Sequence, residues 1–344
     1  MKSFFRCFFL VPTTVLVGTA FSLSTGFAQT PEQFYKGKSV SMMIGLGVGG
    51  GDDNWARIIA RHMTRHMPGN PVFVPSNVLG AGSVVLAKRL ADISPRDGTA
   101  IGLLTSGALF EPLMGNTNIQ LDITKLNWIG SPSRDTNVCV ARTDAPVQTI
   151  DDLKSKELVL GGSGAGGDTV TYPNVFANVL GLKLKVVTGY AGSRDIYLAI
   201  ERNEVQGTCV TYDSISREPL FTEKRVRVLM QSALAADPRL PDIPVAGRMA
   251  QSSEDRQVLE LFLMRSPVGR PFAAPPDVPA DRLAALRTAF AATLKDPETL
   301  AEAKRAGLNA FPTTGQDIAD VVAAAYKTEP RIVERAKKAM TRAE

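Results

Sequence analysis

From residue 39 onward, short apolar runs alternate with longer amphipathic segments. Residues 39–44, 72–75 and 100–105 are apolar runs of strand length, whereas residues 53–67 and 83–93 repeat their apolar positions at helical spacing. Strands that alternate with helices are typical of βαβ units and a largely parallel sheet. Right-handed crossovers bring the carboxyl ends of such strands, and the loops after them, to one edge of the sheet.

A second round of the same alternation begins near residue 140. Its predicted helices and strands are residues 150–155, 158–161, 168–180, 185–188, 193–203, 205–211 and 226–231. A connection rich in proline follows. Beyond it, residues 281–294 predict an amphipathic helix with Leu283, Leu286, Phe290 and Leu294 on one stripe, and residues 297–306 and 314–338 predict two more helices.

This pattern predicts an α/β protein of two domains, each a sheet flanked by helices. We expect the C-terminal tail to return to the first domain, so that the chain crosses between domains near residues 135–142 and again near 262–270. Domain 1 is then residues 29–138 plus 265–344, and domain 2 is residues 139–264. Two crossings make a hinge, and hinged two-domain proteins close around ligands.

The N-terminus has the composition of a secretory signal. Lys2 and Arg6 precede an apolar stretch that runs to about Phe27, and Gly26-Phe27-Ala28 places small residues where a signal peptidase cuts. We interpret residues 1–28 as a signal peptide cleaved after Ala28, which predicts a periplasmic protein. A transmembrane anchor is the alternative, but Pro12 and several small polar residues interrupt the stretch.

Charge and composition exclude several other classes. The formal net charge of +5 stays mildly positive without the signal, and the basic residues do not gather in a patch that would suit nucleic acid. The two histidines, His62 and His66, are interpreted as solvated surface residues and not as metal ligands. Cys139 and Cys209 remain in the mature chain. Export would permit a disulfide, but we expect two separate buried thiols.

Four predicted strand ends lead into loops rich in glycine, each followed by a helix. Glycine lets the backbone approach a ligand, and the helix start supplies unpaired N–H donors, so such a loop binds a carboxylate or phosphate without a cationic side chain. Four loops at matching positions in two domains predict a site for a small anion. The loops are residues 47–53, 77–83, 162–169 and 188–193.

Known catalytic patterns are incomplete in this sequence. Residues 45–50 match the dinucleotide fingerprint, but the next strand ends in Ser76-Asn77 without the acidic residue that holds the ribose. Gly162-Ser163-Gly164 approaches the hydrolase elbow, yet no histidine follows it in the chain. We therefore expect no catalytic residue, metal or cofactor. An exported hydrolase or transferase acting on a small carboxylate remains the alternative.

Some side chains near these loops have two interpretations each. Asp52, Asp53 and Asp168 would ordinarily cap their helices, although Asp53 or Asp168 could instead accept a hydrogen bond from a ligand. Tyr190 and Tyr212 could line the cleft or simply pack between domains. Arg134 and Arg194 are the cationic side chains that we expect nearest the cleft, as candidate carboxylate clamps.

Short motifs along the whole mature chain resemble those of the tripartite tricarboxylate transporter receptors, the Bug-type periplasmic solute-binding proteins. They are Tyr35-x-Gly-Lys38, Gly49-Gly50-Gly51-x-Asp53 leading into Arg57, Asn77-x-x-Gly80-Ala81-Gly82, Pro95-x-Asp97-Gly98, Gly162-Ser163-Gly164, Tyr190-x-Gly192-Ser193 and Leu240-Pro241-Asp242-Ile243-Pro244. The resemblance implies a two-domain Venus-flytrap fold, a periplasmic-binding-protein architecture, that binds a small organic acid or related carboxylate. It also implies delivery to the membrane permease subunits of a tripartite transporter. A sensory receptor that feeds a two-component system is the alternative. We expect a monomer.

The resemblance and the four loops together give a set of candidate ligand-binding residues. In domain 1 they are Val48, Gly49, Gly50, Asp53, Gly80, Ala81 and Ser106; in domain 2 they are Ser163, Gly164, Ala165, Gly166, Thr169, Tyr190, Gly192, Ser193, Tyr212 and Asp213. Asp168 departs from the neutral residue that is common in the family. Its negative charge would disfavour a second ligand carboxylate nearby.

Overall fold

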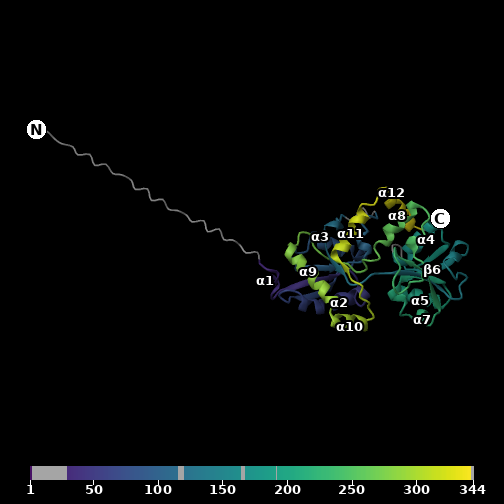
Figure 1. The fold of residues 1–344 in the computed structure, drawn as a ribbon, viewed down its shortest axis with the longest axis horizontal. Helices are drawn as coiled ribbons and strands as arrows, with labels where there is room; N and C mark the ends of the chain where they lie inside the picture. Colours follow the sequence, from purple (N-terminus) through teal and green to yellow (C-terminus); the bar gives the residue numbers. More distant parts are fainter. Residues whose placement is uncertain (2–28, 115–119, 164–166, 191, 342–344) are drawn as a thin grey trace.

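The computed structural model describes residue 1 and residues 29–114, 120–163, 167–190 and 192–341, which form two lobes side by side (Figure 1). Each lobe contains one sheet. The first sheet has the strand order β11-β4-β10-β3-β1-β2 and the second has the order β7-β6-β8-β5-β9. The predicted α/β fold with a helix-flanked sheet in each half is therefore confirmed.

Three strands of the first sheet are parallel and follow one another through helical crossovers. They are β1 (Ser39–Ile44), β2 (Val72–Asn77) and β3 (Ala100–Leu103), with β1 in the middle. Strand β10 (Phe272–Ala274) inserts antiparallel between β3 and β4 (Asn127–Ser131), and β11 (Thr313–Thr314) pairs antiparallel with β4. The chain thus returns to the first sheet after it has built the second.

Helices of the first lobe cover this sheet with their apolar faces. Trp55 and Ile59 of α2 (Gly51–Met63) and Leu286 and Phe290 of α9 (Ala280–Thr293) are buried in one cluster with Phe272. The remaining helices of this lobe are α1 (Pro31–Tyr35), α3 (Val84–Asp92), α10 (Pro297–Arg305) and α11 (Gly315–Tyr326).

The second sheet combines parallel and antiparallel pairs. Strand β6 (Leu158–Gly162) is parallel to both β7 (Leu184–Thr188) and β8 (Gly207–Thr211), whereas β5 (Asn137–Arg142) is antiparallel to β8 and β9 (Val226–Ser232). Its helices are α4 (Asp168–Leu180), α5 (Ser193–Glu201), α6 (Tyr212–Ile215), α7 (Pro219–Thr222) and α8 (Ser253–Leu263).

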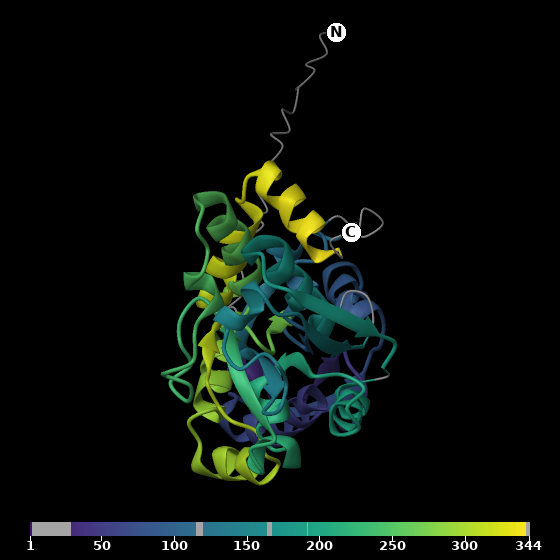
Figure 2. The same cartoon turned by 90° about the vertical axis from the view of Figure 1, so that its right-hand side faces the viewer.

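The last helix, α12 (Pro330–Met340), packs against α4 and α8 of the second lobe (Figures 1 and 2). Asn174 and Asn178 of α4 donate hydrogen bonds to carbonyl groups at its C-terminal end. Our expectation that the whole tail returns to the first domain is wrong for this helix. The division of the chain into domains otherwise stays a prediction.

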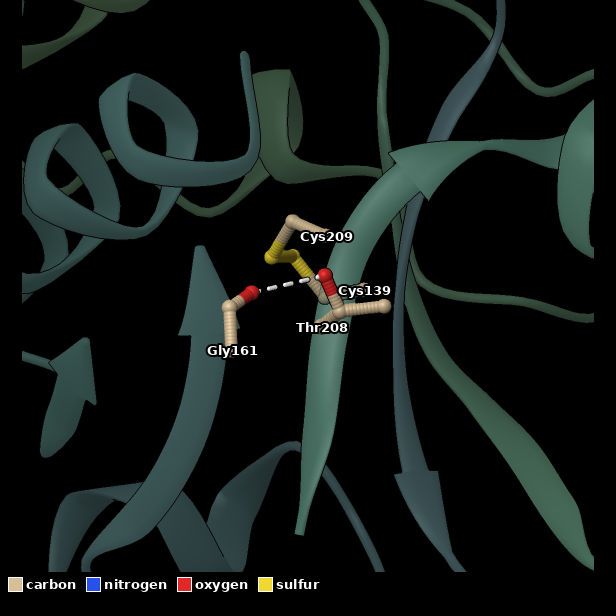
Figure 3. Close-up of a disulfide and its surroundings, with 4 residues drawn as sticks. All are labelled: Cys139, Gly161, Thr208 and Cys209. Carbon is tan, nitrogen blue, oxygen red and sulfur yellow. Dashed lines mark hydrogen bonds between the residues drawn. A yellow bond between two sulfur atoms is a disulfide. The ribbon is translucent and has the colours of Figure 1, made fainter. Parts of the chain in front are cut away.

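Cys139 of β5 and Cys209 of β8 form a disulfide, with their Cα atoms 4.0 Å apart (Figure 3). The two residues are direct partners in the antiparallel register, which brings their side chains to the same face of the sheet. The expectation of two separate thiols is therefore wrong. Next to the disulfide, the Thr208 hydroxyl donates to the Gly161 carbonyl oxygen at 2.9 Å and joins β8 to β6.

The two histidines are not free surface residues, which corrects a third expectation. His62 Nε2 lies 2.6 Å from Glu302 Oε2, and His66 Nε2 lies 2.7 Å from Asp296 Oδ2. Both acidic partners belong to the segment at α10, so the histidines connect α2 and the 3-10 turn Thr64–His66 after it to that segment. No helix of the described residues is long and apolar enough to cross a membrane.

Candidate ligand-binding cleft

A cavity of about 480 Å³ lies between the two lobes, where loops after parallel strands of both sheets face each other. Its first wall comes from Asp52 in α2, the 3-10 turn Ala81–Ser83 and residues 105–111 after β3. Its second wall comes from the start of α4, the end of α8 and Met340 of α12. Cavities of this size at the carboxyl ends of parallel strands are the usual ligand sites of α/β proteins.

Close backbone contacts shape the first wall. A Cβ atom on Gly45, just after β1, would lie 2.2 Å from Ser83 Cβ, so only glycine allows this approach. The Ser83 Oγ accepts a hydrogen bond from the Thr105 amide at 2.8 Å, and the Thr105 hydroxyl donates to the Gly82 carbonyl oxygen at 2.7 Å. The loops after β2 and β3 are thereby held together as one surface.

Arg265 is the cationic side chain of the second wall. Its Nε donates to the Tyr172 hydroxyl at 3.1 Å, and its Nη2 donates to Asp168 Oδ1 at 3.0 Å. The guanidinium also lies over the Tyr172 ring, 4.8 Å from the centroid. The Arg265 side chain is 13% exposed and that of Asp168 is 43% exposed, so the carboxylate faces the open space.

A second arginine joins the first lobe to the crossing between the lobes. Arg270 Nη1 donates to Asp135 Oδ1 at 2.9 Å and to Ser133 Oγ at 2.6 Å, and Arg270 Nε lies 3.2 Å from Asp52 Oδ1. Burial raises the pKa of Asp135 to about 6. Repulsion from Asp52, Asp168 and Asp213 adds to this rise, whereas the attraction of Arg270 opposes it. Negative charges are thus crowded at this end of the cleft.

Only part of the predicted site lines this cavity. Ala81 and Ser106 do, and so do the neighbouring Asp52 and Asp168. Glycines occupy the N-cap positions of α2 and α4, and neither helix has a side-chain cap. The aspartates that we expected to be caps are instead partners of arginines.

Asp53 lies beneath the first loop and not in the cavity. It is 1% exposed, and its carboxylate accepts hydrogen bonds from the Gly49 amide, Arg57 Nε and Asn77 Nδ2. The Gly49 amide is therefore already used by the protein. Val48, Gly50 and Gly80 belong to the adjoining loops and do not line the cavity in this structure.

Most of the predicted residues of the second lobe make contacts within that lobe and do not line the cavity. The Ser163 amide and hydroxyl both pair with the Thr169 hydroxyl, at 2.9 and 3.0 Å. Tyr190 packs into the outer core of its lobe, Gly192 is the N-cap of α5, and Ser193 begins that helix. Gly164, Ala165 and Gly166 lie outside the described residues.

Tyr212 and Asp213 belong to a separate contact between the lobes. Asp213 pairs with Arg239, whose guanidinium lies 4.8 Å from the centroid of the Tyr212 ring, and it accepts a hydrogen bond from Asn309 Nδ2 of the first lobe at 3.1 Å. This contact connects the segment before β11 to the start of α6.

The sequence analysis missed the charged residues that the crossings contribute. Arg265, Arg270 and Asp135 lie within or next to the two predicted crossings, whereas Arg194 is exposed and Arg134 lines a smaller cavity of about 190 Å³. Their position in the sequence could have identified them, because a chain segment that crosses between the lobes borders the cleft. The described residues contain no cluster of three potential metal ligands.

Two helix-flanked sheets with a cleft between them are the architecture of two-domain periplasmic binding proteins. A family model described as the tripartite tricarboxylate transporter family receptor matches residues 55–338. The chain belongs to this family of solute-binding receptors, as its motifs indicated.

Solved structures agree with this fold. The periplasmic binding protein BugD is 22% identical, with a TM-score of 0.63, and the match covers 89% of this chain and 98% of that one. A TctC solute-binding protein from Polaromonas is 17% identical, with a TM-score of 0.69 and coverage of 89% and 99%. MatC from Rhodopseudomonas palustris with bound malate is 19% identical, with a TM-score of 0.59 and coverage of 88% and 99%. No curated protein sequence matches the chain at a significant level.

Proposed function

We propose that this protein is a periplasmic receptor that captures a small carboxylate-containing molecule in the cleft between its lobes. In this proposal, residues 1–28 direct export, the ligand is delivered to the membrane permease subunits of a tripartite tricarboxylate-type transporter, and the receptor catalyses no reaction. The observation that carries the proposal is the cavity of about 480 Å³ at the strand ends, into which polar groups from both lobes converge.

Several features support a carboxylate ligand. The Arg265 guanidinium has five N–H donors, of which Nε and Nη2 are used by Tyr172 and Asp168, while Nη1 has no partner among the described residues. The main-chain N–H groups of Asp168, at the start of α4, and of Gly107 border the same space, whereas the amides of Ala108 and Leu109 already donate to Thr105 and Ser106. MatC, which shares the fold, is a structure with bound malate.

Ligand binding is expected to stabilise the protein against heat. A ligand that binds only the folded state, at 100 times its dissociation constant, adds about 2.7 kcal/mol to the free energy of unfolding. The measurement is a thermal-shift screen of small carboxylates with protein purified from the periplasm of its expression host. If no carboxylate raises the melting temperature and none binds in calorimetry, the proposed function is wrong.

Arg265→Gln is expected to weaken binding of any ligand found in that screen by at least tenfold, because a charge-assisted hydrogen bond to the carboxylate is lost. The matched control is Arg194→Gln, which removes an exposed arginine that does not line the cavity. Calorimetry of both variants measures the effect, and circular dichroism checks that each is folded. Equal affinities for the two variants would place the carboxylate elsewhere.

A further inference from the structure

Carboxylates outnumber cations in the cleft. Asp52, Glu111, Asp135 and Asp168 line the cavity, and they are opposed by Arg265 and by Arg270 just behind the wall. Four acidic groups against two guanidinium groups leave two uncompensated negative charges. The whole chain is positive, with a formal charge of +5, so the charge of the cleft does not follow from composition.

The hydrogen-bond pairing in the cleft shows the same excess of acceptors. Each arginine already donates to a carboxylate, whereas Asp135 Oδ2 and both Glu111 oxygens have no hydrogen-bond partner within the described ranges 29–114, 120–163, 167–190 and 192–341. The surface that meets a ligand therefore offers many acceptors and few donors.

A di- or tricarboxylate would fit this surface poorly. Its second carboxylate would meet like charges, and contacts between like charges disfavour binding. An ammonium group brings three donors and one positive charge, which match the unused oxygens. A ligand with one carboxylate and one ammonium group would use both the open side of Arg265 and the acidic wall.

We propose that the ligand of this cleft carries a cationic nitrogen with N–H donors in addition to its carboxylate, and that Asp168 is the residue that selects for it. The proposal rests on the proposed function, since it takes the same cavity as the ligand site. Asp168 is the most exposed of the paired carboxylates at 43%, compared with 20% for Asp135 and 21% for Asp52. Its position at the cavity surface lets it meet a ligand without loss of its pair with Arg265.

The test uses pairs of small molecules that differ only at the far end. Glutarate and 5-aminopentanoate form one pair, and adipate and 6-aminohexanoate form another; L-lysine adds a further ammonium group. Calorimetry on the full mature protein is expected to give at least tenfold tighter binding for the ammonium member of each pair that binds. Equal or tighter binding of the dicarboxylates would overturn this proposal and leave the proposed function standing. Binding of neither member, nor of any other carboxylate, would overturn both.

The substitution Asp168→Asn tests whether Asp168 selects for the ammonium group of the ligand or only contributes to binding in general. The variant is expected to lose at least tenfold in affinity for the ammonium member and to lose nothing for the dicarboxylate, so that the preference disappears. Glu260→Gln on α8, an exposed residue that does not line the cavity, is the matched control and is expected to keep the preference. If Asp168→Asn fails to fold, Glu111→Gln on the opposite wall tests the same charge. An unchanged preference in folded variants would contradict the role of these carboxylates.

Discussion

The double substitution Cys139→Ala and Cys209→Ala is expected to lower the free energy of unfolding by about 4 kcal/mol. The disulfide joins residues 70 positions apart, and a loop of this length removes that much conformational free energy from the unfolded chain. Both cysteines are almost fully buried, at 1% and 0% exposure, and alanine fills most of their volume without an unpaired polar group. Chemical denaturation followed by circular dichroism measures the difference.

Reductant supplies the internal control for this prediction. Dithiothreitol is expected to shift the denaturation midpoint of the wild-type protein towards that of the double variant and to leave the variant unchanged, because the one other cysteine, Cys7, lies in the proposed signal peptide and is left out of the protein used for the measurement. A difference between the oxidised wild type and the variant below about 1 kcal/mol would mean that the second lobe is held by its packing alone. Alanine at both positions also avoids a single free thiol, which could pair between molecules.

This disulfide illustrates what a local pattern leaves undetermined. The strand runs around Cys139 and Cys209 were visible because side-chain alternation is a property of a few neighbouring residues. The two strands are neighbours in the sheet only because β8 inserts between β5 and β6, which depends on packing of the whole lobe. Sequence alone therefore gave two apolar strands with one cysteine each, and no reason to pair them.

In the candidate site, too, some residues could be placed from the local sequence pattern, whereas others depend on contacts with residues far away in the chain. Ala81 and Ser106 lie in the loops that follow β2 and β3, so their place at the sheet edge follows from the parallel topology, and both line the cavity. Arg265 and Arg270 occupy irregular chain between elements, where no periodicity states which way a side chain points. Their direction is set by Tyr172, Asp168 and Asp135, which are 93 to 135 positions away in the chain.

Asp53→Ala is expected to lower the free energy of unfolding by about 3 kcal/mol. The Asp53 carboxylate is 1% exposed and accepts hydrogen bonds from Arg57 Nε at 2.9 and 3.0 Å, from Asn77 Nδ2 at 3.0 Å and from the Gly49 amide at 3.0 Å. Removal of one partner from a buried ion pair costs about 3–5 kcal/mol, and the low end applies because Arg57 is 34% exposed and regains some water.

The exposed pair Lys88–Asp92 provides a matched control for Asp53, since it has the same spacing of four residues on a helix and side chains about half exposed. Asp92→Ala is expected to lower the free energy of unfolding by at most about 0.5 kcal/mol.

Burial raises the pKa of Asp53, but the hydrogen bonds from Arg57, Gly49 and Asn77 outweigh the effect of burial and lower the pKa to about 2. The unfolded chain therefore binds a proton on Asp53 more readily than the folded protein does. The advantage of the wild type over Asp53→Asn should then be complete above about pH 4 and shrink as the pH falls towards 2, in urea unfolding at each pH. Equal costs for Asp53→Ala and Asp92→Ala would show that the network under the first loop adds no stability of its own.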